Sequence, residues 1–107
     1  MQRSALLRVP ATARRGEVVR VRCMIMHPME NGYRMDAHGT MVPVHLLHTF
    51  ACRYAGEEVF RASLGTGVAA NPYLTFHLLA TESGPVEFTW YDDDGAVHSR
   101  QARIEVT

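Results

Sequence analysis

Soft metal ligands gather in the segment Cys23-Met24-Ile25-Met26-His27-Pro28-Met29-Glu30, which carries a thiol, an imidazole and three thioethers. Copper prefers ligands of these types, so the segment could bind a copper ion. Strand alternation opposes this, because it sends Cys23 to one face of a strand and Met24 and Met26 to the other. Only His27, Met29 and Met26 could then converge. The alternative hypothesis is therefore a small copper-binding β-sandwich protein that uses His27 and the nearby methionines. The purely structural interpretation of the same segment is a core cysteine followed by a loop.

No other cluster has the spacing of a metal or catalytic site. The remaining histidines are scattered along the chain and lack zinc-ligand spacing: His38, His45, His48, His77 and His98. A Gly-x-Ser-x-Gly nucleophile motif is missing from the sequence, and Ser83-Gly84-Pro85 is typical of a turn. We therefore expect no catalytic residue, no bound metal and no cofactor, and we do not expect an enzyme.

Cys23 and Cys52 are the two cysteines, and they lack the Cys-x-x-Cys spacing of redox or zinc sites. Both fall on strand faces that we expect to point inward. A disulfide across the core in an oxidising compartment is one possibility, and two free core thiols are the other.

The elements that must position these side chains are strands, because apolar and polar residues alternate in short runs. In the run from Glu17 to Met26, Val19, Val21, Cys23 and Ile25 share one face. Similar runs lie at 5–9, 46–54, 59–60, 74–78, 86–90 and 102–106. The turns at 55–58 and 92–95 predict hairpins, the second because an Asp-Gly pair separates two alternating runs.

These patterns predict one domain over residues 1–107, an all-β protein with an immunoglobulin-like two-sheet β-sandwich of about seven strands. Helical periodicity is nowhere sustained, and Trp90 suits the core of such a sandwich.

Charge and hydropathy narrow the classes of partner. The chain has 11 basic and 11 acidic residues, mixed along its length, so we expect binding to neither nucleic acid nor membranes. No apolar run has the length of a membrane-spanning helix, and charges interrupt the N-terminus before a signal-peptide core forms. Composition alone would place the protein in the cytosol.

The outward strand faces carry more apolar and aromatic side chains than a freely solvated sheet needs. They include Val18, Met24, Met26, Tyr73, Leu79 and Tyr91. Because methionine and tyrosine are enriched at interfaces, these residues favour a docked partner protein, although another strand or loop of the same domain could cover them.

Four motifs along the chain resemble the SoxZ family in order and spacing. They are His27-Pro28-Met29-Glu30-Asn31-Gly32-Tyr33-Arg34, Ala70-Asn71-Pro72-Tyr73, Ser83-Gly84 through Phe88-Thr89-Trp90, and Asp92-Asp93-Asp94-Gly95. The resemblance implies an immunoglobulin-like sandwich that pairs with SoxY in the SoxYZ carrier of bacterial thiosulfate oxidation. In that family a cysteine on a flexible arm of SoxY carries the sulfur intermediates, and SoxZ is the non-catalytic half.

The resemblance also implies a periplasmic location, reached by export together with SoxY because SoxZ-like chains lack a signal peptide. We expect transient contact with other Sox enzymes through the complex, and the isolated chain could form a homodimer through its unoccupied face. The candidate partner-binding residues are Met24, Met26, His27, Met29, Tyr33, Arg34, Asn71, Pro72 and Tyr73.

Overall fold

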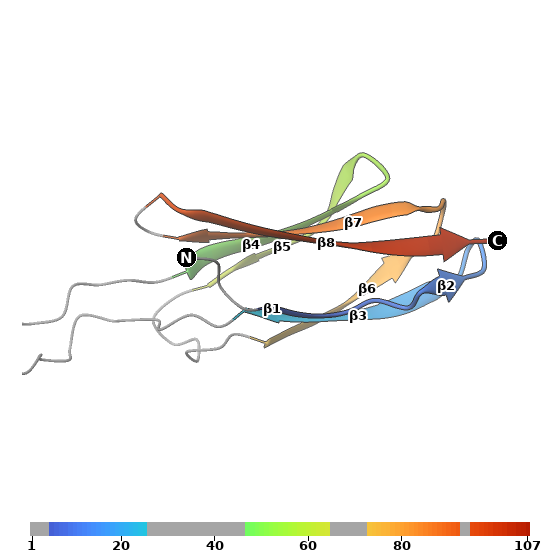
Figure 1. Cartoon of the computed structure of the whole chain (residues 1–107), viewed down its shortest axis with the longest axis horizontal. Helices are drawn as coiled ribbons and strands as arrows, with labels where there is room; N and C mark the ends of the chain where they lie inside the picture. Colours follow the sequence, from blue (N-terminus) through green and yellow to red (C-terminus); the bar gives the residue numbers. More distant parts are fainter. Residues whose placement is uncertain (1–4, 26–46, 65–72, 93–94) are drawn as a thin grey trace, which may run out of the picture.

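The computed structural model describes residues 5–25, 47–64, 73–92 and 95–107, which form two packed β-sheets (Figure 1). The strands are β1 (Ala5–Arg8), β2 (Thr12–Ala13), β3 (Val18–Ile25), β4 (Leu47–Tyr54), β5 (Glu57–Ser63), β6 (Tyr73–Leu79), β7 (Gly84–Asp92) and β8 (Val97–Val106). One sheet has the order β1-β3-β6 and the other the order β2-β8-β7-β4-β5. The predicted all-β sandwich is confirmed.

The alternation of side chains in β3 sets which of its residues enter the core. Val19, Val21, Cys23 and Ile25 are all buried, while Val18 and the two arginines between them are exposed. A strand whose side chains point to opposite faces must place every second residue in the core. The inward face predicted for this run is therefore confirmed.

The short strand β2 was not predicted, and it brings the total to eight strands. The chain leaves the three-stranded sheet after β1, and Pro10 follows, a residue that cannot donate a backbone hydrogen bond to continue the ladder. Thr12 and Ala13 then pair in parallel with Glu105 and Val106 of β8, in the other sheet. Two residues carry no periodicity, so alternation could not have revealed this strand.

Irregular pairing changes the burial expected in β4. The register between β4 and β7 shifts between Leu47 and Thr49, which leaves His48 as an extra residue that points outward. Ala51 lies on the outer face but is buried, because its short side chain sits between Arg61 of β5 and Thr89 of β7.

Both predicted hairpins are present. β4 and β5 are joined at Ala55 and Gly56, which have positive φ angles of 55° and 79°. β7 and β8 are joined by a turn in which the Asp92 amide donates to the Ala96 carbonyl over 2.9 Å. Gly95 in this turn has a φ of 90°, a conformation that glycine adopts without strain.

Aromatic rings form the centre of the core. The Phe50 ring lies 5.1 Å from Trp90 and 6.0 Å from Phe76, measured between ring centroids. At one side of the sandwich, Phe60 of β5 stacks on Phe76 of β6 at 4.4 Å, so these rings join the edge strands of the two sheets. Trp90 is fully buried, as predicted.

The Tyr54 hydroxyl ties β4 to the chain between β6 and β7. It accepts hydrogen bonds from the backbone amides of Thr81 (3.0 Å) and Glu82 (2.9 Å) and donates to the Glu82 carbonyl. One buried side chain thus satisfies three backbone groups of a connection that leaves the three-stranded sheet and enters the five-stranded one.

Candidate partner-binding face

The outward side chains of β1, β3 and β6 form a surface that we call the three-stranded face. Its residues are Leu6, Arg8, Val18, Arg20, Arg22, Met24, Tyr73, Thr75, His77 and Leu79. The strand register arranges them in four rows. An apolar row, Leu6-Met24-Tyr73, is followed by Arg8-Arg22-Thr75, then by Arg20-His77, and finally by a second apolar row, Val18-Leu79.

The two apolar rows are accessible to solvent. Val18 is 61% exposed, Leu79 52% and Tyr73 50%, while Met24 is half-buried between Leu6 and Tyr73. Large apolar side chains gathered on one outer face are typical of a surface that another protein covers.

Beside the first apolar row lies a recess of about 700 Å³ whose lining includes three arginines. Arg8 and Arg22 stand directly opposite each other on neighbouring antiparallel strands, and Arg20 follows two residues along β3. Leu6, Pro10 and Tyr73 also line the recess. The face therefore combines cationic and apolar groups in one depression.

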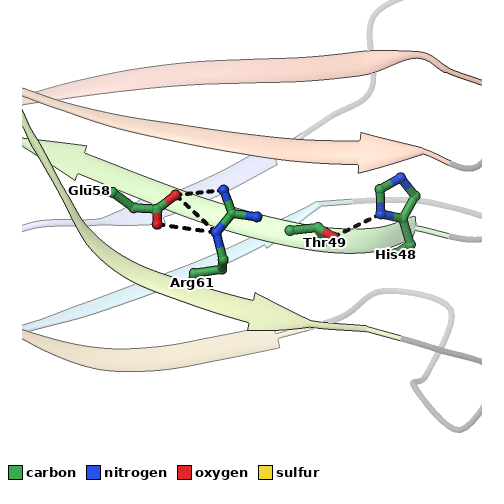
Figure 2. A network of polar contacts seen from close by, with 4 residues as sticks. All are labelled: His48, Thr49, Glu58 and Arg61. Carbon is green, nitrogen blue, oxygen red and sulfur yellow. Dashed lines mark hydrogen bonds and ion pairs between the residues drawn. The ribbon is translucent and has the colours of Figure 1, made fainter.

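The five-stranded sheet has a different outer surface, on which opposite charges are paired. Figure 2 shows Arg61 donating to both carboxylate oxygens of Glu58, with a shortest N···O distance of 2.8 Å. This contact lowers the pKa of the Glu58 carboxyl below its usual range. Figure 2 also shows the Nδ1 of His48 at 2.8 Å from the Thr49 hydroxyl.

Two of the predicted partner-binding residues can be placed, and they are neighbours. Met24 of β3 and Tyr73 of β6 are directly paired across the two strands on the three-stranded face. The others lie outside the described residues: Met26, His27, Met29, Tyr33, Arg34, Asn71 and Pro72. A role for any of the nine in partner binding stays a prediction.

The apolar residues expected on outward faces divide between the two sheets. Val18, Met24, Tyr73 and Leu79 share the three-stranded face. Tyr91 lies on β7 in the other sheet, where its ring stacks with His48 at 6.3 Å. Tyr91 is therefore not part of the same patch.

Sequence reasoning missed the arginine cluster. Arg20 and Arg22 alternate with buried valines, so their shared face was visible in the sequence. The position of Arg8 beside them depends on the pairing of β1 with β3, which alternation alone does not give.

Both cysteines are free thiols in the core, so the structure holds the second of the two alternatives for this pair. Their side chains are 1% and 0% exposed. Burial raises the pKa of each thiol from 9.0 to about 12, and nearby Cys52 adds to the rise for Cys23. Only the thiolate is nucleophilic, so neither cysteine is a reactive group near neutral pH.

The structure does not test the ligand set of the copper hypothesis, which consists of His27 and the methionines near it. Cys23 points into the core and Met24 points to the three-stranded face, as alternation required. His27, Met26 and Met29 lie outside the described residues. Within the described ranges, no three His, Cys, Asp or Glu side chains are grouped so that they could hold a metal ion.

The described histidines have ordinary neighbours. His98 on β8 lies 3.6 Å from the buried carboxylate of Asp92, His48 contacts Thr49 and Tyr91, and His77 is exposed on β6.

Within the described part of the chain, no helix is long and apolar enough to cross a membrane.

Comparison with protein families gives one match that covers most of the chain. Residues 7–103 match the family described as sulphur oxidation protein SoxZ. No curated protein sequence matches the chain.

Solved structures with the same fold are known. A superoxide reductase (neelaredoxin) from Ignicoccus hospitalis has a TM-score of 0.73 and 18% identity, over 97% of this chain and 80% of that one. A candidate superoxide reductase from Thermotoga maritima has a TM-score of 0.61 and 15% identity, over 96% of this chain and 85% of that one. Identities this low indicate a shared sandwich fold and nothing about activity.

Proposed function

This chain belongs to the SoxZ family of sulphur oxidation proteins, and on that premise we propose that it pairs with SoxY through the three-stranded face. Members of the family are the non-catalytic partner in the SoxYZ carrier complex of bacterial sulfur oxidation, so the protein is not an enzyme. The match over residues 7–103 is the observation that carries the assignment.

The composition of the three-stranded face supports its use for SoxY. Leu6, Met24 and Tyr73 form a continuous apolar row across all three strands, and side chains of these types supply much of the buried area at protein interfaces. The row lies where β3 ends and β6 begins. The predicted partner-binding residues outside the described part lie in the sequence within nine residues after β3 or immediately before β6.

Inert cysteines suit a subunit of a sulfur carrier. In the proposed complex a cysteine on the SoxY arm holds the sulfur intermediate, and an accessible thiolate on the partner would compete for that sulfur by exchange. Burial removes both thiols of this chain from such exchange. The folded body therefore supports the arm without taking part in the chemistry.

The proposed site of action is the periplasm, where members of the family work in sulfur-oxidising bacteria. Export in a complex with SoxY would bring this chain there. Transient contacts with other Sox enzymes would then be made by the assembled carrier.

Co-expression with SoxY from the same organism tests the proposal. We expect the two chains to purify together, with light scattering giving the stoichiometry. Met24→Ala combined with Tyr73→Ala should weaken the complex at least about tenfold, because truncating central interface side chains commonly costs more than 1 kcal/mol each.

Val97→Ala is the matched control, since Val97 is 56% exposed on β8 of the other sheet. It should leave the affinity unchanged. Equal affinities for the double variant and the control would show that SoxY docks elsewhere, and a failure of the wild-type chain to bind SoxY would remove the proposed function itself.

A further inference from the structure

The centre of the three-stranded face carries only positive charge in a chain whose formal net charge is zero. All seven acidic residues of the described part lie on the other sheet or in connections: Glu17, Glu57, Glu58, Glu82, Glu87, Asp92 and Glu105. Every one of the 11 basic residues is an arginine. In the described part of the chain, the three-stranded face thus carries arginines and no acidic residue, whereas the outer surface of the other sheet carries both signs of charge.

This arrangement costs the isolated chain stability. Like charges directly opposite each other on antiparallel strands repel, and Arg8 and Arg22 are such a pair, with Arg20 adjacent. Within the described residues, no side-chain carboxylate contacts any of these three guanidinium groups. A counter-charge supplied by a bound partner would relieve the repulsion.

The form of the recess favours a protein surface over a small anion. Small-anion sites usually add backbone N–H donors to their cations, whereas around Arg22 the strand β3 is paired on both sides, with β1 and β6. The arginines also lie between two exposed apolar rows, and the four rows together span roughly 20 Å along the strands at about 3.4 Å per residue. A surface of that length that combines apolar and cationic side chains matches a protein interface.

We propose that the three-stranded face docks a partner surface on which carboxylates lie opposite Arg8, Arg20 and Arg22, between two apolar contacts. This rests on the proposed function and adds the chemistry of the SoxY surface that sits there. Arginine suits the role because its planar guanidinium binds a carboxylate through two parallel hydrogen bonds. Two copies of this chain paired face to face would bring the same cations together, so the occupant that we propose is SoxY and not a second copy.

The rate of association with SoxY, measured by surface plasmon resonance against salt concentration, tests this inference. Arg8→Glu combined with Arg22→Glu should lower the association rate constant at least about tenfold at low salt, because complementary charges steer encounter. The difference should narrow as salt screens the charges. Arg53→Glu combined with Arg103→Glu makes the same change in net charge on the other sheet and should have a much smaller effect.

Rescue gives the positive test. Substituting lysine for carboxylates on the docking surface of SoxY should restore fast association with the Arg8→Glu, Arg22→Glu variant. Circular dichroism checks that both double variants stay folded, which is expected because all four arginines are exposed on strands.

Three results would overturn the inference. If SoxY binds the wild type and both double variants at equal rates, the face does not dock an acidic surface, while the proposed function stands. If sodium thiosulfate alone saturates the wild type at micromolar concentration but not the Arg8→Glu, Arg22→Glu variant, the recess is a small-anion site. If the wild type does not bind SoxY, the proposed function fails and the inference with it.

Discussion

Removing the hydroxyl of Tyr54 should lower the free energy of unfolding measurably, although the substitution deletes only one oxygen atom. The side chain is buried, and its hydroxyl accepts from the amides of Thr81 and Glu82 and donates to the Glu82 carbonyl. Tyr54→Phe keeps the ring and its packing but leaves three backbone groups without that partner. The connection between β6 and β7 then loses its attachment to β4.

The magnitude follows from the two amides. A buried donor left unsatisfied costs about 1–3 kcal/mol, and this connection is only partly buried, so water can partly replace the hydroxyl. We therefore use the lower end of the range for each amide and expect a loss of about 2 kcal/mol. For a domain of this size that corresponds to a fall in melting temperature of roughly 10 °C.

Trp90 provides the assay, because it is the only tryptophan and is fully buried. Its fluorescence during urea unfolding should give a lower midpoint for Tyr54→Phe with an unchanged slope, which indicates altered stability rather than altered compactness. Tyr73→Phe is the control, since Tyr73 is half exposed on the three-stranded face. A change below about 0.5 kcal/mol for Tyr54→Phe, no larger than a surface substitution gives, would refute the reasoning.

Three further predictions concern the thiols, the arginines and the second hairpin. A thiol reagent at pH 8 should leave Cys23 and Cys52 unmodified in the folded chain and modify both in urea. Because the pKa of each thiol is higher in the folded chain than in the unfolded one, the free energy of unfolding should fall as pH rises from about 9 towards 12. Arg22→Gln should stabilise the isolated chain by a few tenths of a kcal/mol at low salt, measured by urea unfolding, and the gain should vanish at high salt if repulsion from Arg8 causes it. Gly95→Ala should cost about 1 kcal/mol in thermal unfolding, since the φ of 90° strains any residue with a Cβ although no atom lies within 4 Å of the added carbon; an unchanged melting temperature would contradict this.

Local alternation was enough to predict the class of fold and most of the core. In β3 every buried residue was predicted, because the side-chain period of a strand is two and one face must be apolar. Trp90 and both hairpins were predicted for similar reasons, since apolar faces and turn residues are local features. The four sequence motifs also identified the SoxZ family, which the match over residues 7–103 confirms.

The departures come from interactions between strands far apart in the sequence. β2 exists because it pairs with β8 at the other end of the chain, and the burial of Ala51 depends on its neighbours in β5 and β7. His48 points outward only because the register with β7 shifts beside it. None of these pairings leaves a signal in the residues themselves.

The sequence by itself determined that the chain forms strands, which residues of each strand share a face, and which family the protein belongs to. The tertiary structure alone decided that Met24 and Tyr73 lie side by side, that Tyr91 belongs to the opposite sheet, and that Arg8 stands against Arg22. The physical reason is that a strand's own residues set its two faces, whereas its partner strand and register set which side chains meet across it. The pairing of β1, β3 and β6 forms the apolar and cationic face to which we propose that SoxY binds.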